Sequence, residues 1–131
     1  MSQENVERAR RCVEAVNRRD QEAFLALMDP AVVIESRLVV MEGGYHGHDG
    51  VRRWWGDFLG TFPDYQLEIE EVRDLGDVTL LRGRGSAHGS TSDTPLDDRF
   101  WQPIRWRDGK CVWWRNCPTE EEALEAAGVS E

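Results

Sequence analysis

The sequence has no long apolar run, little cysteine and no excess of basic residues, and each lack argues against a class of protein. No apolar run approaches the roughly 20 residues that a membrane-spanning helix needs. Lys and Arg number 16 against 25 Asp and Glu, which gives a formal net charge of −9. Nucleic-acid binding and attachment to anionic membranes depend on clustered basic residues, so both are disfavoured.

The three cysteines are an odd number and are poorly spaced for a disulfide or a metal site. If residues 111–117 form a strand, Cys111 and Cys117 lie about 20 Å apart, beyond disulfide reach. A C-x5-C pair without neighbouring ligands is also a weak zinc signature. Cys12 falls on the apolar side of a predicted helix, where a free thiol packs as a small hydrophobe. The polar start, MSQENVERARR, has no apolar signal segment, so we expect a cytoplasmic protein. We expect no cofactor.

The 131 residues have the size of one domain, and no repeat, low-complexity tract or linker divides them. We therefore expect a single domain over 1–131. Apolar residues at helical spacing predict a helix over 4–18, and Asp20 is a candidate N-cap for a short helix that ends at Asp29-Pro30. The β-branched segment 31–40 predicts a strand, and the glycine-rich segment 42–50 a loop. Asp49 then precedes a third helix with a broad apolar stripe: Val51, Trp55, Phe58 and Phe62.

The second half of the chain is mostly β. Strands are predicted over 65–75, 77–89, 97–106 and 110–117, and Asp108-Gly109 is a hairpin signal. Thr119 and Glu122 have capping-box spacing for a final short helix that Gly128 closes. Helices first and a meander of strands afterwards predict an α+β domain in which helices cover one face of a curved antiparallel sheet. Such a sheet leaves a concave pocket.

Three segments in this order, YHGHDGVRRWW, FPDYQLEIEEVRDLGD and RDGK…EEALEAAGV, resemble the SnoaL-like branch of the nuclear transport factor two-like superfamily. The resemblance covers nearly the whole chain. It implies a cone-shaped α+β barrel, in which a strongly curved antiparallel sheet wraps around three N-terminal helices and a short helix follows. It also implies a homodimer formed through the outer face of the sheet. The superfamily includes polyketide cyclases, ketosteroid isomerase and limonene epoxide hydrolase, so the fold does not assign a function.

Carried over from the epoxide hydrolase, Trp114 matches a cavity-facing tryptophan and Asn116 matches the catalytic aspartate. An amide has no accessible pKa and can only donate and accept hydrogen bonds. Gly83 and Gly85 stand where that enzyme has an arginine and a second aspartate, so its mechanism is not expected here. These glycines suit a sharp strand bend or an enlarged pocket. The cyclases also depend on an aspartate near the end of the sheet, which puts their mechanism in doubt too.

Because side chains alternate along a strand, Val112, Trp114 and Asn116 are predicted to face the cavity. The residues between them are then predicted to face outward: Cys111, Trp113, Arg115 and Cys117. Gln102, on one face with Phe100 and Ile104, would place a second amide near Asn116. Two amides in an aromatic cavity can bind a carbonyl or stabilise an oxyanion, or they can satisfy each other or a buried water.

Glu35 and Arg37 alternate onto one face of the first predicted strand. Pointing inward they would form an ion pair, with Glu35 available as a general base if burial raises its pKa. Pointing outward they would be a solvated pair near the strand end.

His46 and His48 form an H-x-H pair beside Asp49, but no third ligand is evident, so no metal site is expected. His88 alternates with arginines opposite the glycines and is predicted to face outward. An outer strip of arginines is expected to pair with the many carboxylates. These arginines are Arg82, Arg84, Arg105, Arg107 and Arg115.

The aromatic residues suit both a core and a pocket wall. Their helical spacing places Trp55, Phe58 and Phe62 in the core, and the resemblance implies that they also line the cavity opposite the last strand, together with Phe100 and Trp114. Two other tryptophans, Trp101 and Trp113, are predicted on the outer face, where an apolar patch indicates a partner surface, most simply that of a twofold dimer.

Three functions remain open from the sequence. The first hypothesis is a protein that binds a small apolar carbonyl compound, such as a steroid, a polyketide or a terpenoid, with Arg37 and the amides as polar contacts. The second is an isomerase or cyclase that uses Glu35 as its base and Asn116 with Gln102 to polarise a carbonyl. The third is an interaction module whose cavity has collapsed. Base stacking by the tryptophans ranks last, because it works beside a positive groove.

Overall fold

The computed structural model describes residues 2–37, 41–88 and 95–129. Its elements follow the chain as α1 (Ser2–Arg18), α2 (Gln21–Ala26), β1 (Met28–Glu35), β2 (Tyr45–His46), α3 (Gly47–Thr61), β3 (Gln66–Asp74), β4 (Val78–Ala87), β5 (Leu96–Arg107), β6 (Lys110–Arg115) and α4 (Glu120–Ala127). The residues 38–40 and 89 of the predicted strands lie outside the described residues. No helix in the described ranges is long and apolar enough to cross a membrane.

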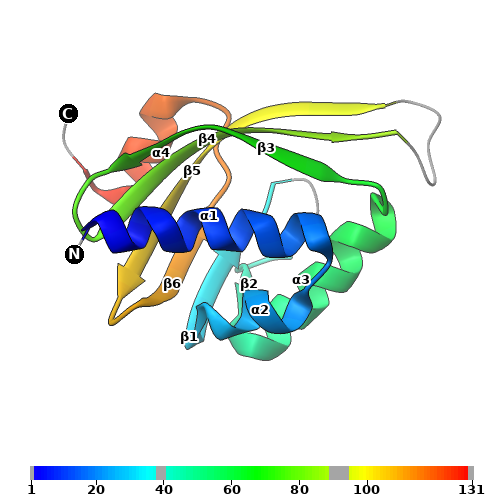
Figure 1. Ribbon diagram of the computed structural model, residues 1–131, viewed down its shortest axis with the longest axis horizontal. Helices are drawn as coiled ribbons and strands as arrows, with labels where there is room; N and C mark the ends of the chain where they lie inside the picture. Colours follow the sequence, from blue (N-terminus) through cyan, green and yellow to red (C-terminus); the bar gives the residue numbers. More distant parts are fainter. Residues whose placement is uncertain (1, 38–40, 89–94, 130–131) are drawn as a thin grey trace.

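Six strands form one curved sheet in the order β2-β1-β6-β5-β4-β3 (Figure 1). All neighbours are antiparallel except β1 and β6, which pair in parallel, so the sheet joins the first strand to the last. Helix α1 lies across the face of the sheet and packs on β3 and β4, while α3 packs on β1 (Figure 1). The predicted α+β cone with three N-terminal helices is confirmed, although the sheet is not closed.

Local signals placed several element ends correctly, although α2 ends at Ala26 and the Asp29-Pro30 pair predicted to end it already belongs to β1. The Asp20 side chain accepts the backbone N–H of Ala23 as an N-cap, and Thr119 does the same for Glu122. Gly128 ends α4 in the left-handed region, with a φ of 70°. At the start of α3 the prediction was wrong, because the helix begins at Gly47 and Asp49 lies inside its first turn.

The core lies between the helices and the concave inner face of the sheet. Its main cluster joins Val16 of α1, Phe24 of α2 and Trp54 of α3 to Trp114 of β6. A second cluster lies on the other face, where Ala123 and Leu124 of α4 cover Leu80 and Cys117. The three N-terminal helices therefore cover the inner face of the sheet, and the last helix, α4, covers part of the outer face.

Candidate functional site

A small cavity remains between the helices and the inner face of the sheet. Its volume is about 40 Å³, room for about three water-sized groups and far below the roughly 300 Å³ or more of most ligand pockets. Six aromatic side chains line it: Phe24, Trp54, Phe58, Tyr65, Phe100 and Trp114. In this conformation the cavity admits a slender apolar group, and a fused ring system would require the wall to move.

Trp54 lies at the centre of the aromatic wall. Its ring stacks on Phe24 and Phe58, with centroids 5.7 and 5.5 Å apart, and meets Trp114 edge-on at 5.2 Å. Its indole Nε1 is buried without a hydrogen-bond partner among the described residues. A buried unpaired donor costs free energy, and ordered water or a ligand commonly satisfies such a group.

The helical stripe of α3 was predicted one residue out of register at this wall. Val51, Trp54 and Phe58 are the buried residues, whereas Trp55 is only partly buried and packs against Phe24. Phe62 is also partly buried and packs on Phe58. Trp55 and Phe62 were expected in the cavity but do not line it, and Trp54 takes the place predicted for Trp55.

A β-bulge changes the inner face of β6. Arg105 of β5 pairs with Trp113, yet the next residue, Trp106, pairs with Cys111, so Val112 is an extra residue on β6. Both Cys111 and Trp114 therefore point inward, three residues apart, and both line the cavity. The predictions that Cys111 faces outward and that Val112 lines the cavity are wrong, because the bulge breaks the period of two.

Two thiols, Cys12 of α1 and Cys111 of β6, lie in the cavity wall. Burial raises the pKa of the Cys12 thiol to about 12. Burial also raises the pKa of Cys111 well above its usual value, and the neighbouring Cys12 adds to this. Both groups are thus neutral thiols rather than nucleophilic thiolates at neutral pH. Cys117 was predicted to face outward and does lie on the outer side, but α4 buries it.

The two amides predicted to meet do so at the cavity wall. Gln102 Nε2 donates a hydrogen bond of 2.8 Å to Asn116 Oδ1, and both residues line the cavity. Within the described residues, Asn116 Nδ2 and Gln102 Oε1 form no further hydrogen bond. The pair consequently leaves both N–H groups of Asn116 Nδ2 and the carbonyl oxygen of Gln102 for a ligand.

Glu35 does not lie inside the cavity. It is paired with Arg115 in the parallel ladder, on the side opposite the buried Ile34 and Trp114. Its Oε1 accepts a 2.8 Å hydrogen bond from Trp113 Nε1. The alternation of β1 therefore directs this carboxylate to the outer face, and the inward ion pair with Arg37 is not formed.

Arg37 instead forms an ion pair with Asp98 of β5 through its Nη2. Asp98 lies opposite Gly85 in the ladder and two residues before the buried Phe100, so its side chain belongs to the same inner face. Its side chain is 16% exposed and that of Arg37 is 34% exposed, so the pair is partly shielded from water. Sequence reasoning missed Asp98, although its position two residues before Phe100 was a usable signal.

The two glycines of β4 leave space for aromatic rings. A Cβ on Gly85 would lie 2.1 Å from the Tyr65 hydroxyl oxygen, and one on Gly83 would lie 3.1 Å from Phe100 Cζ. Both rings belong to the cavity wall. Burial raises the pKa of Tyr65, and the negative charge of Asp98 adds to this, so the hydroxyl is a neutral donor.

A second hollow adjoins the cavity and is called the outer basin here. It has a volume of about 550 Å³, and Ser36 and Asn116 line both spaces. Its charged lining residues are Glu35, Arg37, Glu42, Arg115 and Glu122. The basin is thus polar and of mixed charge, whereas the inner cavity is aromatic.

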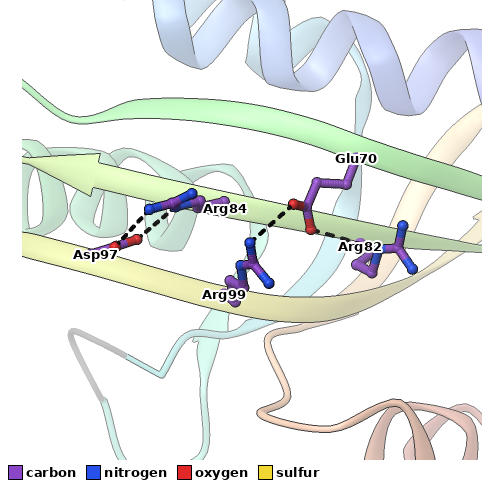
Figure 2. Close-up of polar contacts among 5 residues, drawn as sticks. All are labelled: Glu70, Arg82, Arg84, Asp97 and Arg99. Atoms are coloured by element: carbon purple, nitrogen blue, oxygen red, sulfur yellow. Dashed lines mark hydrogen bonds and ion pairs between the residues drawn. The ribbon is translucent and has the colours of Figure 1, made fainter.

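On the outer face of the sheet, Arg82, Arg84, Arg99 and Arg105 pair with carboxylates, whereas Arg107 and Arg115 form no ion pair among the described residues. Figure 2 shows Arg84 forming two hydrogen bonds with Asp97, while Arg82 and Arg99 both reach Glu70. The hydrogen bonds from Arg84 hold the pKa of Asp97 below its usual value. Pairing was the expected outcome for the five arginines of the predicted strip, and it is found for Arg82, Arg84 and Arg105.

The two outer tryptophans are less available than predicted. Trp101 packs against the apolar cluster beneath α4, and the Trp113 indole donates a hydrogen bond to Glu35. Arg105 is also engaged, with its Nη2 donating to the Ala127 carbonyl at the end of α4. The apolar patch inferred from the sequence is therefore partly covered by the chain itself.

The histidines do not build a metal site in the part of the chain that the structure describes. His46 Nε2 lies 2.7 Å from the Gly43 carbonyl, and His48 Nε2 lies 2.9 Å from the Met28 carbonyl. His88 is exposed beside Asp64, as predicted. Among the described residues, no group of three potential ligands comes together.

Comparison with known families agrees with this architecture. The SnoaL-like domain family matches residues 9–114, which is most of the chain. The chain belongs to this SnoaL-like family. No curated protein sequence matches it significantly.

Solved structures of this fold superpose over nearly the full length of the SnoaL-like chain. A protein of unknown function with the nuclear transport factor two-like fold, from Burkholderia pseudomallei, has a TM-score of 0.79 at 20% identity, covering 93% of this chain and 95% of that one. A putative polyketide cyclase, IdmH from Streptomyces antibioticus, has a TM-score of 0.73 at 21% identity and coverage of 94% and 97%.

A third similar structure holds a small ligand. It is a hypothetical protein with a ketosteroid isomerase-like fold from Catenulispora acidiphila, in complex with trimethylamine. Its TM-score is 0.77 at 13% identity, and the match covers 95% of this chain and 94% of that one. At these identities, the three likenesses establish the fold alone.

Proposed function

We propose that this SnoaL-like protein binds a small apolar carbonyl compound, polyketide-like or terpenoid-like in character, without needing to transform it. The apolar part of the ligand enters the aromatic cavity, and its carbonyl oxygen accepts a hydrogen bond from Asn116 Nδ2. The observation that carries the proposal is an aromatic cavity that ends at an amide pair with an unused donor. Pockets of this kind are mostly apolar, with a few polar groups that orient the ligand.

The size of the cavity selects among carbonyl compounds. At about 40 Å³ it accommodates a short alkyl segment better than a steroid nucleus. The outer basin can hold the remainder of the molecule, because Asn116 borders both spaces. Relatives of this fold include a putative polyketide cyclase and a protein crystallised with trimethylamine, which is consistent with a site for small molecules.

The geometry disfavours the alternative of an isomerase or cyclase in which Glu35 takes a proton from a group held in the aromatic cavity. The Glu35 carboxylate lies on the outer face and accepts a hydrogen bond from Trp113. A base must come within hydrogen-bond reach of the proton it abstracts. The part of a ligand held in the aromatic cavity would lie on the other side of the sheet from this carboxylate, which lines the outer basin alone.

The proposal extends to a cytoplasmic homodimer. Three free cysteines agree with a reducing compartment. The charges on the outer face alternate in sign, as Arg82, Glu70 and Arg99 illustrate, so this face can complement a second copy of itself. Sedimentation equilibrium tests this assembly, and a monomer at every concentration would contradict it.

A binding experiment with 2-heptanone tests the proposed function. Titration followed by two-dimensional NMR should show saturable shifts of the Asn116 side-chain amide and the Trp54 and Trp114 indole signals. Asn116→Leu should weaken binding by about tenfold, because the ketone oxygen loses its donor. Gln66→Leu also replaces a side-chain amide by leucine, at an exposed position of β3, and should leave the affinity unchanged. Absence of any saturable shift with apolar ketones would refute the proposal.

A further inference from the structure

The guanidinium of Arg37 forms few of the hydrogen bonds that it could form. Only its Nη2 is hydrogen-bonded, to Asp98, and its Nε is buried without a partner in the described part of the chain. Nη1 likewise forms no hydrogen bond with the described residues, while the side chain as a whole is 34% exposed to the outer basin. Since an arginine has five N–H donors, most of this group's capacity is unused.

We propose that Arg37 is a second anchor, which binds a second neutral carbonyl oxygen of the same ligand in the outer basin. This rests on the proposed function, because it assumes that a first carbonyl lies at Asn116. The ligand class is then an apolar chain that ends in two carbonyl groups, as in a β-diketone or a β-keto ester.

The position of Arg37 suits this role. Ser36 and Asn116 line both the cavity and the outer basin, and Arg37 directly follows Ser36. A ligand that passes from the aromatic wall to Asn116 and continues outward therefore enters the space beside Arg37. Asp98, held on the inner face of β5, fixes the guanidinium at this border. Such prior fixation lowers the entropy lost on binding.

Electrostatics favour a neutral head over a charged one. The charge of Arg37 is balanced by Asp98. Among the described residues, three carboxylates, Glu35, Glu42 and Glu122, line the basin against one further arginine, Arg115. A ligand carboxylate would lie among these like charges, and a ligand ammonium would face the guanidinium. A neutral carbonyl oxygen can accept a hydrogen bond from Nη1 without repulsion from the carboxylates or from the guanidinium.

A cycle of two ligands and two variants tests the second anchor. The ligands are 2-heptanone and 2,4-heptanedione, which have the same seven-carbon chain and differ by one carbonyl group in place of a methylene. In the wild-type protein the dione should bind about tenfold more tightly, which is the expected gain from one hydrogen bond to a charged donor. Arg37→Gln should remove this gain while the affinity for 2-heptanone stays the same. Arg115→Gln makes the same charge change in the same basin and should preserve the gain.

The outcomes separate this inference from the proposed function. If both ligands bind with equal affinity, or if the gain survives Arg37→Gln, the second anchor is refuted while ketone binding stands. If neither ligand binds, the proposed function itself fails. Heptanoate provides the charged comparison, and a gain equal to that of the dione would contradict a neutral head. Should Arg37→Gln fail to fold, Arg37→Lys can be tested instead. It keeps the charge but loses the planar guanidinium donors, and it should reduce the affinity gain of the dione over 2-heptanone.

Discussion

The two faces of the sheet differ in how fully their polar groups are satisfied. On the outer face Arg84 is bonded to Asp97, and Arg82 and Arg99 share Glu70 (Figure 2). On the inner face, Trp54 Nε1 has no hydrogen-bond partner among the described residues, and the Asn116–Gln102 pair has donor and acceptor capacity that these residues do not use. Charges that are paired within the chain need no ligand, whereas unused groups beside an aromatic cavity indicate one. The difference locates binding on the inner side.

The largest expected effect comes from removing the centre of the inner wall. Trp54→Ala should lower the free energy of unfolding by about 4 kcal/mol, because a large buried ring leaves a cavity. Trp55→Ala, one residue along the same helix, should cost about 1 kcal/mol, because that ring is only partly buried. Urea denaturation measures both. Equal losses would mean that α3 presents a different face to the sheet.

A second test concerns the space that glycine provides inside the sheet. Gly85→Ala should destabilise the protein by about 3 kcal/mol, because the new methyl group would overlap the Tyr65 ring. Gly56→Ala, in α3 with nothing near the added carbon, should instead stabilise by about 0.5 kcal/mol through helix propensity. Thermal unfolding monitored by circular dichroism compares the two. A neutral Gly85→Ala would refute the close packing of Tyr65 on β4.

A smaller effect should appear at alkaline pH. Burial raises the pKa of Cys12 from 9.0 to about 12, so the unfolded chain releases this proton first. The stability that Cys12 contributes is present below pH 9 and is lost as the pH rises toward 12. Cys12→Ala should therefore reduce the loss of unfolding free energy between pH 8 and pH 10 by about 1 kcal/mol. Urea curves at the two pH values measure this, and an unchanged difference would contradict a buried thiol.

The smallest effect is expected on the outer face. Arg84→Gln removes an exposed ion pair with Asp97, and such pairs contribute little to stability. The urea midpoint should shift only slightly, and ketone binding should not change. A large loss of ketone affinity would break the contrast between the two faces.

The sequence predicted the elements better than their faces. The apolar spacing of α3 correctly predicted a helix, but Trp54 and Trp55 are equally apolar, and tertiary packing against Phe24 and Trp114 decides which one faces inward. In β6 the alternation placed Trp114 correctly and Cys111 wrongly, because a bulge at Val112 depends on pairing with β5. A single strand's sequence does not reveal such a bulge.

Part of the candidate site could be predicted and part could not. The meeting of Gln102 with Asn116 followed from strand alternation and the resemblance, and the structure brings them together. The inward orientation of Asp98 could have been predicted by the same alternation, because Asp98 lies two residues before Phe100. Its pairing with Arg37 was not, because it joins segments 61 residues apart across the sheet.

The central claim is that a ligand binds on the inner face, and adjacent tryptophans of β6 test it directly. Trp114 lines the cavity, whereas Trp113 lies on the outer face beside Glu35. With saturating 2-heptanone, nuclear Overhauser contacts should connect the terminal methyl group of the ligand's alkyl chain to the rings of Trp114 and Trp54, and not to that of Trp113. Contacts to Trp113, or no contacts to any ring, would contradict the account.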